Sequence, residues 1–321
     1  MVARHRPSRS ACFVACLLVA GAATPAAAAC QPPRTTGAGL ALVLSGGGAK
    51  GAWEAGVAAA LVERGEPIRL VAGSSSGALN AAMIADGRLD RLEAIWRTIT
   101  RERVYALRPS VFFAGLLPGW LTLLGLNASG SLFDPRPLRE LIGASLDLER
   151  VRVSGVRVLV VTTDLTRGVK RVFDNATLTV DALMAAAAVP GAFPPVEVEG
   201  AFLVDGGVTG RAPVLETLES GAAVDRALVV MGFAPDERRE RPNSIRRALE
   251  AAFEIAMMAQ IQRDTELARL RHPGIDVQML APSAPLDLRP QDFDPARTGP
   301  AFEHGKRDGA ACVEVWRALA R

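Results

Sequence analysis

The sequence has few cysteines and histidines, and they do not cluster. Four cysteines and three histidines are spread over 321 residues, with no C-x-x-C pair. Protein sites for zinc and related metals combine such side chains at short, regular spacings. We therefore expect no metal site, and none of the motifs described below requires a cofactor.

Long basic runs are absent as well. All 34 acidic side chains lie beyond residue 29, and setting aside Arg4, Arg6 and Arg9 leaves 34 of the 37 basic ones. The remaining chain is close to neutral, and no basic patch follows from its sequence. Nucleic acid is therefore not expected as the main partner. A hydrophobic content of 49% with 22% charged residues is typical of a globular protein with a sizeable core.

Residues 1–29 have the three parts of an export signal. An arginine-bearing start is followed by the apolar stretch Ala11–Ala23 and then by the small residues of "TPAAAAC". The apolar part is shorter than the stretch that a membrane-spanning helix needs. We therefore expect export to the periplasm, the outer membrane or cell envelope, or the medium.

Cys30 follows the alanines directly, in the position of the acylated cysteine of bacterial lipoproteins. Such signals usually carry leucine three residues earlier, where this chain has Ala27. Cys30 and Cys312 are the only cysteines left if Cys12 and Cys16 are removed with the signal. The sequence therefore leaves two alternatives, lipidation of Cys30 or a disulfide between Cys30 and Cys312.

The rest of the chain alternates expected strands and helices. Apolar runs predict strands, and helical spacing between them predicts helices that end at glycine or proline. This order favours an α/β fold with three layers and a mainly parallel central sheet. We expect a linker over 30–38, a catalytic domain over 39–235 and a mostly helical part over 236–321. The expected strands are 40–44, 68–72, 156–164 and 226–233, and the expected helices are 49–64, 78–85, 179–189, 243–271 and 300–319.

The stretch "SVFFAGLLPGWLTLLGL" over 110–126 breaks this alternation. It is strongly apolar, yet glycine and proline interrupt it at four positions. Two interpretations remain open, a broken helix within the core or a flexible cap that touches a membrane beside the active site.

The stretch "LALVLSGGGAKGAW" over 40–53 contains a glycine pattern that fits a dinucleotide-binding turn. That interpretation requires an acidic residue at the end of the second strand, and the second strand ends instead in Gly73-Ser74-Ser75. A phosphate-binding loop is also excluded, because no Gly-Lys-Ser/Thr follows. The pattern is compatible with a turn whose backbone N–H groups face the oxygen of an attacked carbonyl.

The stretch "AGSSSGALNAA" holds one G-x-S-x-G match, formed by Gly73, Ser75 and Gly77. This motif marks a sharp turn from a strand into a helix, which exposes the central serine in a strained conformation. The glycines on either side relieve the crowding that the turn creates. Ser75 is therefore the candidate nucleophile.

A serine nucleophile needs a base, and the sequence offers two kinds. Asp205 in "FLVDGGV" is one candidate, although Asp-Gly between apolar runs is also a common hairpin turn. His272 and His304 are the histidines beyond the signal, and either would complete a Ser-Asp-His triad of the α/β-hydrolase type. The residues alone leave these alternatives open.

In combination, "GGGAKG", "GSSSG" and "DGG" resemble the three signatures of the patatin-like phospholipase family. "AAAAVPGAFPPV" over 185–196 is similar to the Pro/Phe-rich connection of that family, and the resemblance covers about residues 39–215. It implies a patatin-like fold and a lipid acyl hydrolase that cleaves carboxylic esters of phospholipids or lysophospholipids. A lipid or ester substrate and a membrane surface are the partners that it implies.

The resemblance also implies roles for single residues. Ser75 would be the nucleophile and Asp205 the base of a dyad without histidine, with Gly206 and Gly207 supporting Asp205. The remaining site residues would be the oxyanion loop Gly46, Gly47 and Gly48 with the basic residue Lys50. One departure concerns Arg211, which stands where the family commonly has asparagine. A catalytically inactive lipid-binding envelope protein with the same fold is a further alternative.

Overall fold

The computed structural model describes residues 30–35, 37, 39–114, 130–233 and 241–318. The expected export signal over 1–29 lies outside the described residues, as does most of the apolar stretch over 110–126. Of that stretch, the structure shows only the helix α5 (Pro109–Ala114).

A single eight-stranded sheet forms the centre of the described part of the molecule, in the order β10-β9-β1-β2-β5-β8-β7, with β6 also paired to β5. The strands from β10 to β5 run parallel, whereas β6 and β8 are antiparallel to β5 and β7 is antiparallel to β8. The mainly parallel sheet is thus confirmed. The strands are β1 (Leu40–Leu44), β2 (Ile68–Gly73), β5 (Arg157–Asp164), β6 (Val169–Asp174), β7 (Val196–Val198), β8 (Ala201–Asp205), β9 (Arg226–Val230) and β10 (Asp276–Leu280), with a separate pair β3 (Ala106–Leu107) and β4 (Phe133–Asp134).

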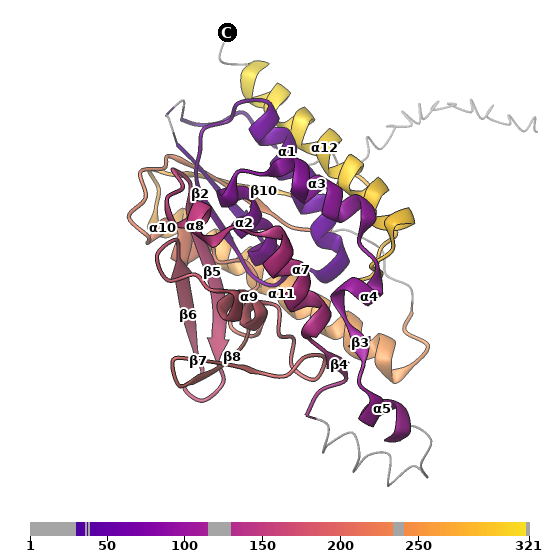
Figure 1. The fold of residues 1–321 in the computed structure, drawn as a ribbon. Coiled ribbons are helices and arrows are strands. Elements are labelled where there is room, and N and C mark those ends of the chain that lie inside the picture. Colours follow the sequence, from indigo (N-terminus) through magenta and orange to yellow (C-terminus); the bar gives the residue numbers. More distant parts are fainter. Residues whose placement is uncertain (1–29, 36, 38, 115–129, 234–240, 319–321) are drawn as a thin grey trace, which may run out of the picture.

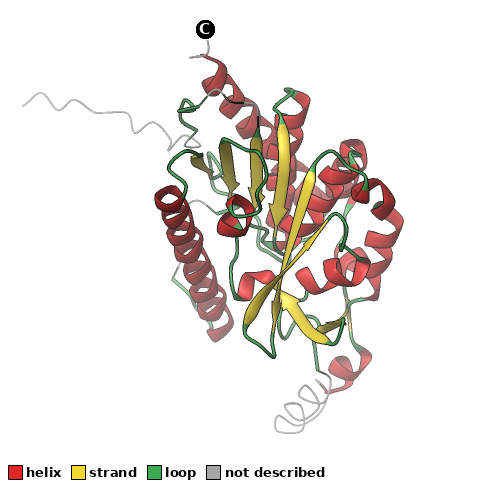
Figure 2. Ribbon diagram, turned by 90° about the vertical axis from the view of Figure 1, so that its left-hand side faces the viewer, coloured by secondary structure: helices red, strands yellow, loops and turns green. Residues whose placement is uncertain are grey.

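Helices cover both faces of this sheet, which gives the three expected layers (Figure 2). Strand β1 shows why both faces need cover, because it is apolar at every position and successive side chains point to opposite faces. Leu40, Leu42 and Leu44 pack into one cluster of buried residues, and Ala41 and Val43 pack into the other.

The helices divide between the two faces according to these clusters. Helices α10 (Val214–Leu218) and α11 (Ile245–Arg271) pack on the face of Ala41, and the others that contribute buried residues pack on the face of Leu42. These others are α1 (Gly51–Glu63), α2 (Ser76–Asp86), α3 (Leu89–Thr98), α4 (Arg101–Val104), α7 (Arg136–Ser145), α8 (Leu148–Arg152), α9 (Val180–Ala186) and α12 (Pro295–Ala318). Short 3-10 turns lie at Gly48–Lys50 and Gly206–Val208.

Helices α1 and α12 lie side by side in a very close packing (Figure 1). A Cβ atom on Gly56 would lie 2.0 Å from the Phe302 carbonyl oxygen, and one on Gly305 would lie 2.0 Å from the Trp53 carbonyl oxygen. Glycine within a helix costs about 1 kcal/mol relative to alanine. Here that cost is offset by the direct approach of the two backbones.

The C-terminal part of the chain contributes more than the expected helices. Strand β10 pairs with β9 and becomes the edge of the sheet, which the sequence analysis did not anticipate. The segment expected as a linker lies against this edge. The Gln31 N–H donates to Gln278 Oε1 at 3.1 Å, and Arg34 Nε donates to Asp276 Oδ1 at 2.9 Å.

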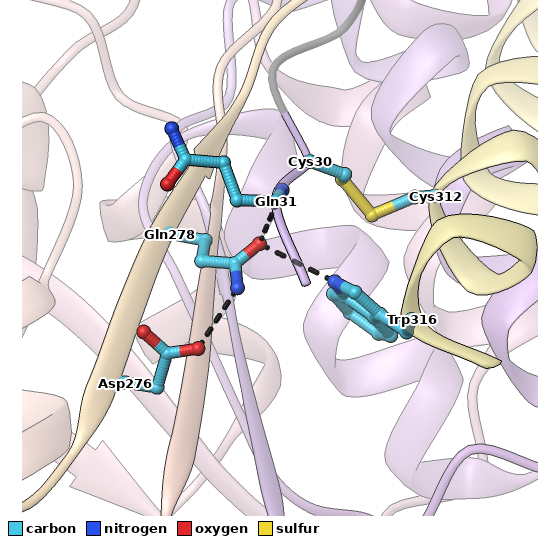
Figure 3. The surroundings of a disulfide bond; sticks show 6 residues. All are labelled: Cys30, Gln31, Asp276, Gln278, Cys312 and Trp316. Carbon is cyan, nitrogen blue, oxygen red and sulfur yellow. Dashed lines mark hydrogen bonds between the residues drawn. A yellow bond between two sulfur atoms is a disulfide. The ribbon is translucent and has the colours of Figure 1, made fainter. Parts of the chain in front are cut away.

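A disulfide joins Cys30 to Cys312 on α12, with a Cα–Cα distance of 5.3 Å (Figure 3). Trp316 Nε1 donates to Gln278 Oε1 at 3.3 Å beside it, so the start of the described chain, β10 and α12 meet at one point. A cysteine in a disulfide cannot carry a lipid on its sulfur. The structure therefore favours the pairing alternative over lipidation of Cys30.

The disulfide gives a testable prediction. Replacing Cys312 by serine is expected to lower the free energy of unfolding by about 2–5 kcal/mol, because the bond closes a loop that spans most of the chain. Urea unfolding without reductant measures this difference. The double variant Cys30→Ser/Cys312→Ser is the control, since its stability should not respond to added reductant. Recovery of Cys30 and Cys312 as separate free-thiol peptides from the non-reduced wild type would contradict the prediction.

Candidate active site

Ser75 occupies a strained turn between β2 and α2. Its φ is 55° and its ψ is −134°, a backbone conformation that residues other than glycine rarely adopt. A Cβ on Gly73 would lie 2.3 Å from the Gly77 carbonyl oxygen, so the turn cannot close with a side chain there. The turn therefore has the geometry that the G-x-S-x-G pattern predicts.

The candidate base reaches Ser75 from another strand. Asp205 is the last residue of β8, which runs antiparallel to β5 and ends beside Thr162. The Asp205 N–H donates to the Ala188 carbonyl at 3.0 Å, and the Ser75 N–H donates to the Ala186 carbonyl at 3.1 Å. Carbonyls two residues apart, at the carboxyl end of α9 and just beyond it, thus hold the backbones of both residues.

The Asp205 carboxylate is buried and only partly hydrogen-bonded. Its Oδ1 accepts from the Gly207 N–H at 2.7 Å and from Ser74 Oγ at 3.4 Å. Its Oδ2 is buried and has no partner within 3.5 Å among the described residues. Burial raises the pKa of Asp205, whereas the Arg211 charge, the Gly207 N–H and the hydroxyls of Ser75 and Ser74 lower it. The Ser75 hydroxyl is thus close enough to lower the pKa of Asp205, although Oδ2 accepts no hydrogen bond from the described residues.

The D-G-G stretch is not the hairpin turn that was the alternative interpretation. The hairpin of this region lies earlier, between β7 and β8. After Asp205 the chain leaves the sheet through the 3-10 turn Gly206–Val208. Gly206 is required there, because a Cβ would lie 2.3 Å from the Val161 carbonyl oxygen and 2.8 Å from Ser74 Oγ.

The expected oxyanion loop lies beside the Ser75 turn. Gly46, Gly47 and Gly48 have φ values of 74°, 137° and 61°. A Cβ on Gly77 would lie 2.6 Å from the Leu44 carbonyl oxygen and 2.8 Å from the Gly46 nitrogen, so the two loops touch through their backbones. No acceptor for the N–H of Gly47 or Gly48 occurs in the described part of the chain. Both groups border the cavity that Ser75 lines.

Gly46 departs from the expectation that it donates to a substrate oxygen. Its N–H lies 3.0 Å from both carboxyl oxygens of Glu54 on α1. Glycine is needed at this position for another reason, since a Cβ would lie 2.3 Å from the Ser74 carbonyl oxygen. The donors left for a substrate oxygen are Gly47 and Gly48.

Glu54 is a site residue that the sequence analysis missed. It is 0% exposed, and it also accepts from Ser45 Oγ at 2.7 Å. Burial raises the pKa of Glu54 to about 8, against the opposing effects of Ser45, Gly46 and the Arg211 charge. A carboxyl group amid an otherwise apolar helix, one turn after the glycine loop, was the signal that could have identified it.

Two buried cations complete the site. Lys50 Nζ lies 4.0 Å from the centroid of the Phe233 ring and 3.9 Å from Glu254 Oε1. Arg211 lies over the same ring, 5.6 Å from its centroid, and donates through Nη1 to the Met257 sulfur at 2.8 Å. Lys50 was predicted as a site residue. Arg211 was identified only as a departure from the family pattern.

A cavity of about 1550 Å³ opens in front of Ser75. Gly47, Gly48, Lys50 and Arg211 border it on the catalytic side. The rest of its wall is mostly apolar. Four helices contribute to this wall: α2 with Leu79 and Met83, α3 with Leu92, Ile95 and Trp96, α7 with Leu138, Leu141 and Ile142, and α9 with Leu183. Residues outside these helices add Ile99, Tyr105, Phe133 and Phe193.

Neither candidate histidine lines this cavity. His272 follows α11 and precedes the amino end of β10, whereas Ser75 follows the carboxyl end of β2. Because these strands run parallel, the two residues lie at opposite ends of the strands. His304 Nε2 lies 2.8 Å from Ser283 Oγ and 3.2 Å from Asp308 on α12. The arrangement thus brings Asp205, and not a histidine, to the serine.

The described residues contain neither a candidate metal cluster nor a candidate membrane span. Among these residues, no three histidine, cysteine, aspartate or glutamate side chains form a group that could hold a metal ion. No helix within the described ranges combines the length and the apolar character needed to cross a bilayer.

Comparison with known proteins adds the family. The family model described as "Patatin-like phospholipase" matches residues 42–218. An uncharacterized NTE family protein of Mycobacterium tuberculosis is 30% identical over 241 residues, which cover 72% of this chain and 62% of that protein. Lysophospholipase NTE1 of Candida glabrata is 28% identical over 200 residues, which cover 58% of this chain and 10% of that protein.

Among solved structures, VipD from Legionella pneumophila is similar with 17% identity and a TM-score of 0.44, over 86% of this chain and 66% of that chain. This chain therefore matches less than two thirds of the length of each of these three proteins.

The geometry of Glu54 predicts its effect on activity. Glu54→Ala is expected to reduce kcat for an ester substrate by up to about 100-fold, because the loop that carries Gly47 and Gly48 loses its anchor. Glu54→Gln keeps an acceptor for Ser45 and Gly46 and should retain most of the activity. Equal activity of Glu54→Ala and wild type, measured with a soluble chromogenic ester, would contradict this role.

Glu54 also predicts a pH dependence of stability. Because the pKa of Glu54 is raised in the folded protein, its contribution is fully present below about pH 4.5 and is lost as the pH rises towards 8. Each unit of pKa difference corresponds to about 1.36 kcal/mol. The advantage of wild type over Glu54→Gln in free energy of unfolding should therefore fall by several kcal/mol over this range. Urea titrations at a series of pH values measure it, and parallel curves would refute it.

Proposed function

Because the chain belongs to the patatin-like phospholipase family, we propose that it is a serine-dependent lipid acyl hydrolase with Ser75 as nucleophile and Asp205 as base. The observation that carries the proposal is the placement of Ser75. Its strained turn lines a large, mostly apolar cavity, and its side chain is near enough to the buried Asp205 carboxylate to lower the pKa of Asp205.

In the first half of the reaction, Asp205 Oδ2 accepts the proton of Ser75 Oγ as Oγ attacks the ester carbonyl carbon. The carbonyl oxygen becomes an anion, for which the N–H groups of Gly47 and Gly48 are the available donors. Such donors typically contribute a few kcal/mol each to transition-state stabilisation. The carbon–oxygen bond to the alcohol then breaks, and the alcohol leaves with the proton from Asp205.

In the second half, water hydrolyses the acyl-serine. Asp205 takes a proton from the water as it attacks the acyl carbonyl, and the same two N–H groups stabilise the second oxyanion. Collapse of this intermediate releases the fatty acid and returns the proton to Ser75 Oγ. The site is then ready for another substrate.

An aspartate can perform this role without histidine because of its surroundings. Burial raises the pKa of Asp205, which makes its carboxylate a stronger base than one in water. The nearby charge of Arg211 and the Gly207 N–H act in the opposite direction and favour the ionised form that the reaction requires.

The cavity supports a long acyl chain as the part of the substrate that is held in the protein. Its wall of leucine, isoleucine and aromatic side chains provides apolar burial for such a chain. The name of the Candida relative, a lysophospholipase, agrees with a lipid ester substrate. We therefore propose phospholipids or lysophospholipids as the substrate class.

Access to this cavity supports contact with a lipid surface. Leu107 and Phe253 line the cavity and are also exposed, and exposed Phe112 lies on α5 near Leu107 in sequence. Exposed apolar side chains at the mouth of an apolar cavity suit an enzyme that takes its substrate from a membrane. The proposed location is the cell envelope after export, which agrees with the disulfide of Cys30, since disulfides persist in oxidising compartments.

A fluorophosphonate probe tests the nucleophile. The probe should label wild type and Ser76→Ala but not Ser75→Ala, because Ser75 combines the strained turn, a place in the cavity wall and proximity to Asp205. Asp205→Asn should lower kcat for a lipid ester by about 10²- to 10⁴-fold, the range typical of a lost general base. Liquid chromatography with mass spectrometry of the released fatty acid measures turnover.

The same assay separates the alternatives. The double variant His272→Ala/His304→Ala is the control and should retain activity, because neither histidine lines the cavity. Complete loss of activity in the folded double variant would favour the triad. A folded wild type that neither reacts with the probe nor releases fatty acid would favour the inactive lipid-binding protein.

A further inference from the structure

Arg211 is a buried cation inside the site. The residue lies between the 3-10 turn after Asp205 and α10, and only 7% of it is exposed. Burial lowers the pKa of Arg211, although a guanidinium remains charged in proteins. A buried charge normally requires a partner of opposite sign with good hydrogen-bond geometry.

No such partner is present in the described part of the chain. Nη1 donates to the Met257 sulfur at 2.8 Å, and a thioether is a weak acceptor. Nε is buried and makes no hydrogen bond there. Asp205, Glu54 and Glu254 influence the ionisation of Arg211, but none of these carboxylates lies within the 4.0 Å of an ion pair.

The position of Arg211 relates this unmet requirement to the substrate. A Cβ on Gly47 would lie 3.1 Å from Arg211 Nη2, so the guanidinium borders the loop that carries the free N–H groups. Arg211 also lines the cavity that Ser75 lines. A ligand bound for attack by Ser75 therefore lies within reach of the guanidinium.

The surroundings favour an anion over a neutral group. Lys50 and Arg211 both lie against the ring of Phe233, so two cations border the same part of the cavity. Glu254 lies 3.9 Å from Lys50, and the raised pKa of Glu54 keeps that group mostly protonated near neutral pH. Of these two cations, Arg211 is the one with no carboxylate within 4.0 Å among the described residues.

We propose that Arg211 is a specificity-determining residue that binds the phosphate of a glycerophospholipid substrate beside the Gly47–Gly48 loop. The proposal rests on the proposed lipid acyl hydrolase function. Guanidinium groups hold phosphate through two parallel N–H donors, and in glycerophospholipids only the glycerol backbone separates the phosphate from the ester that Ser75 attacks.

The experiment compares two substrates with one oleoyl chain, 1-oleoylglycerol 3-phosphate and the neutral 1-oleoylglycerol, in the same nonionic detergent micelles. Arg211→Gln should lower kcat/KM for release of oleate from the phosphate-bearing substrate about 10- to 100-fold more than from the neutral one. This is the effect expected when a charge-assisted hydrogen-bonded contact is lost. Arg211→Lys keeps the charge without the two-donor geometry and should recover part of the selectivity.

The ratio of the two kcat/KM values separates this role from support of Asp205. A change in the pKa of Asp205 alters both rates together and shifts both pH profiles, whereas the ratio at one pH stays constant. An unchanged ratio in Arg211→Gln would therefore overturn the proposal, even if both rates fall.

Arg226→Gln is the matched control for loss of a buried arginine. Arg226 is the first residue of β9 and is 9% exposed, close to the 7% of Arg211. It pairs with Glu66 at 3.1 Å, at the amino end of the parallel strands, whereas Ser75 lies at their carboxyl end. This variant should lose thermal stability without a change in the substrate ratio. If wild type hydrolyses neither ester, the proposed function itself fails. If wild type hydrolyses both esters and Arg211→Gln keeps its ratio, only the role of Arg211 fails.

Discussion

The site depends on a direct contact between two backbone loops. The turn after β1 and the turn after β2 approach so closely that a Cβ on Gly46 or Gly77 would overlap the other loop. No side chain separates the Gly46–Gly48 loop from the Ser75 turn at this contact, and their relative position therefore follows from main-chain geometry. This closeness requires positive φ values at Gly46–Gly48 and strain at Ser75. The parallel pairing of β1 with β2 places both turns at the same edge of the sheet.

Such closeness leaves polar groups in the interior that must be satisfied locally. Glu54 satisfies one of them, because its carboxyl group accepts the Gly46 N–H and the Ser45 hydroxyl behind the loop. Asp205 and Arg211 are not fully satisfied, since one carboxylate oxygen and one guanidinium nitrogen lack partners in the described chain. Unsatisfied buried groups reduce stability, and they persist most readily where they serve function. Glu54 thus holds the loop, whereas Asp205 and Arg211 keep buried polar atoms without partners in the described chain beside the cavity that Ser75 lines.

Much of this arrangement could be predicted from local sequence signals. The glycine pattern, the central serine of G-x-S-x-G and the apolar runs of β1 and β2 each specify a local conformation, and the comparisons confirm the family resemblance. Glu54 and the charge environment of Arg211 could not be predicted, because their roles arise from contacts between distant segments. Strand β10 was missed for a similar reason. "DVQML" is short and mixed in character, and it becomes a strand by pairing with β9.

The carboxyl end of α9 and the residues that follow it hold both members of the proposed Ser75–Asp205 dyad. The Ala186 and Ala188 carbonyls accept the N–H groups of Ser75 and Asp205, so this segment holds the two backbones relative to each other. Both alanines are buried or nearly so, and larger side chains would force this segment away from the strands that it connects. A triad places an imidazole between serine and carboxylate and tolerates a longer separation. In the proposed dyad the carboxylate takes the serine proton directly, which requires the two backbones to be held in place as Ala186 and Ala188 hold them.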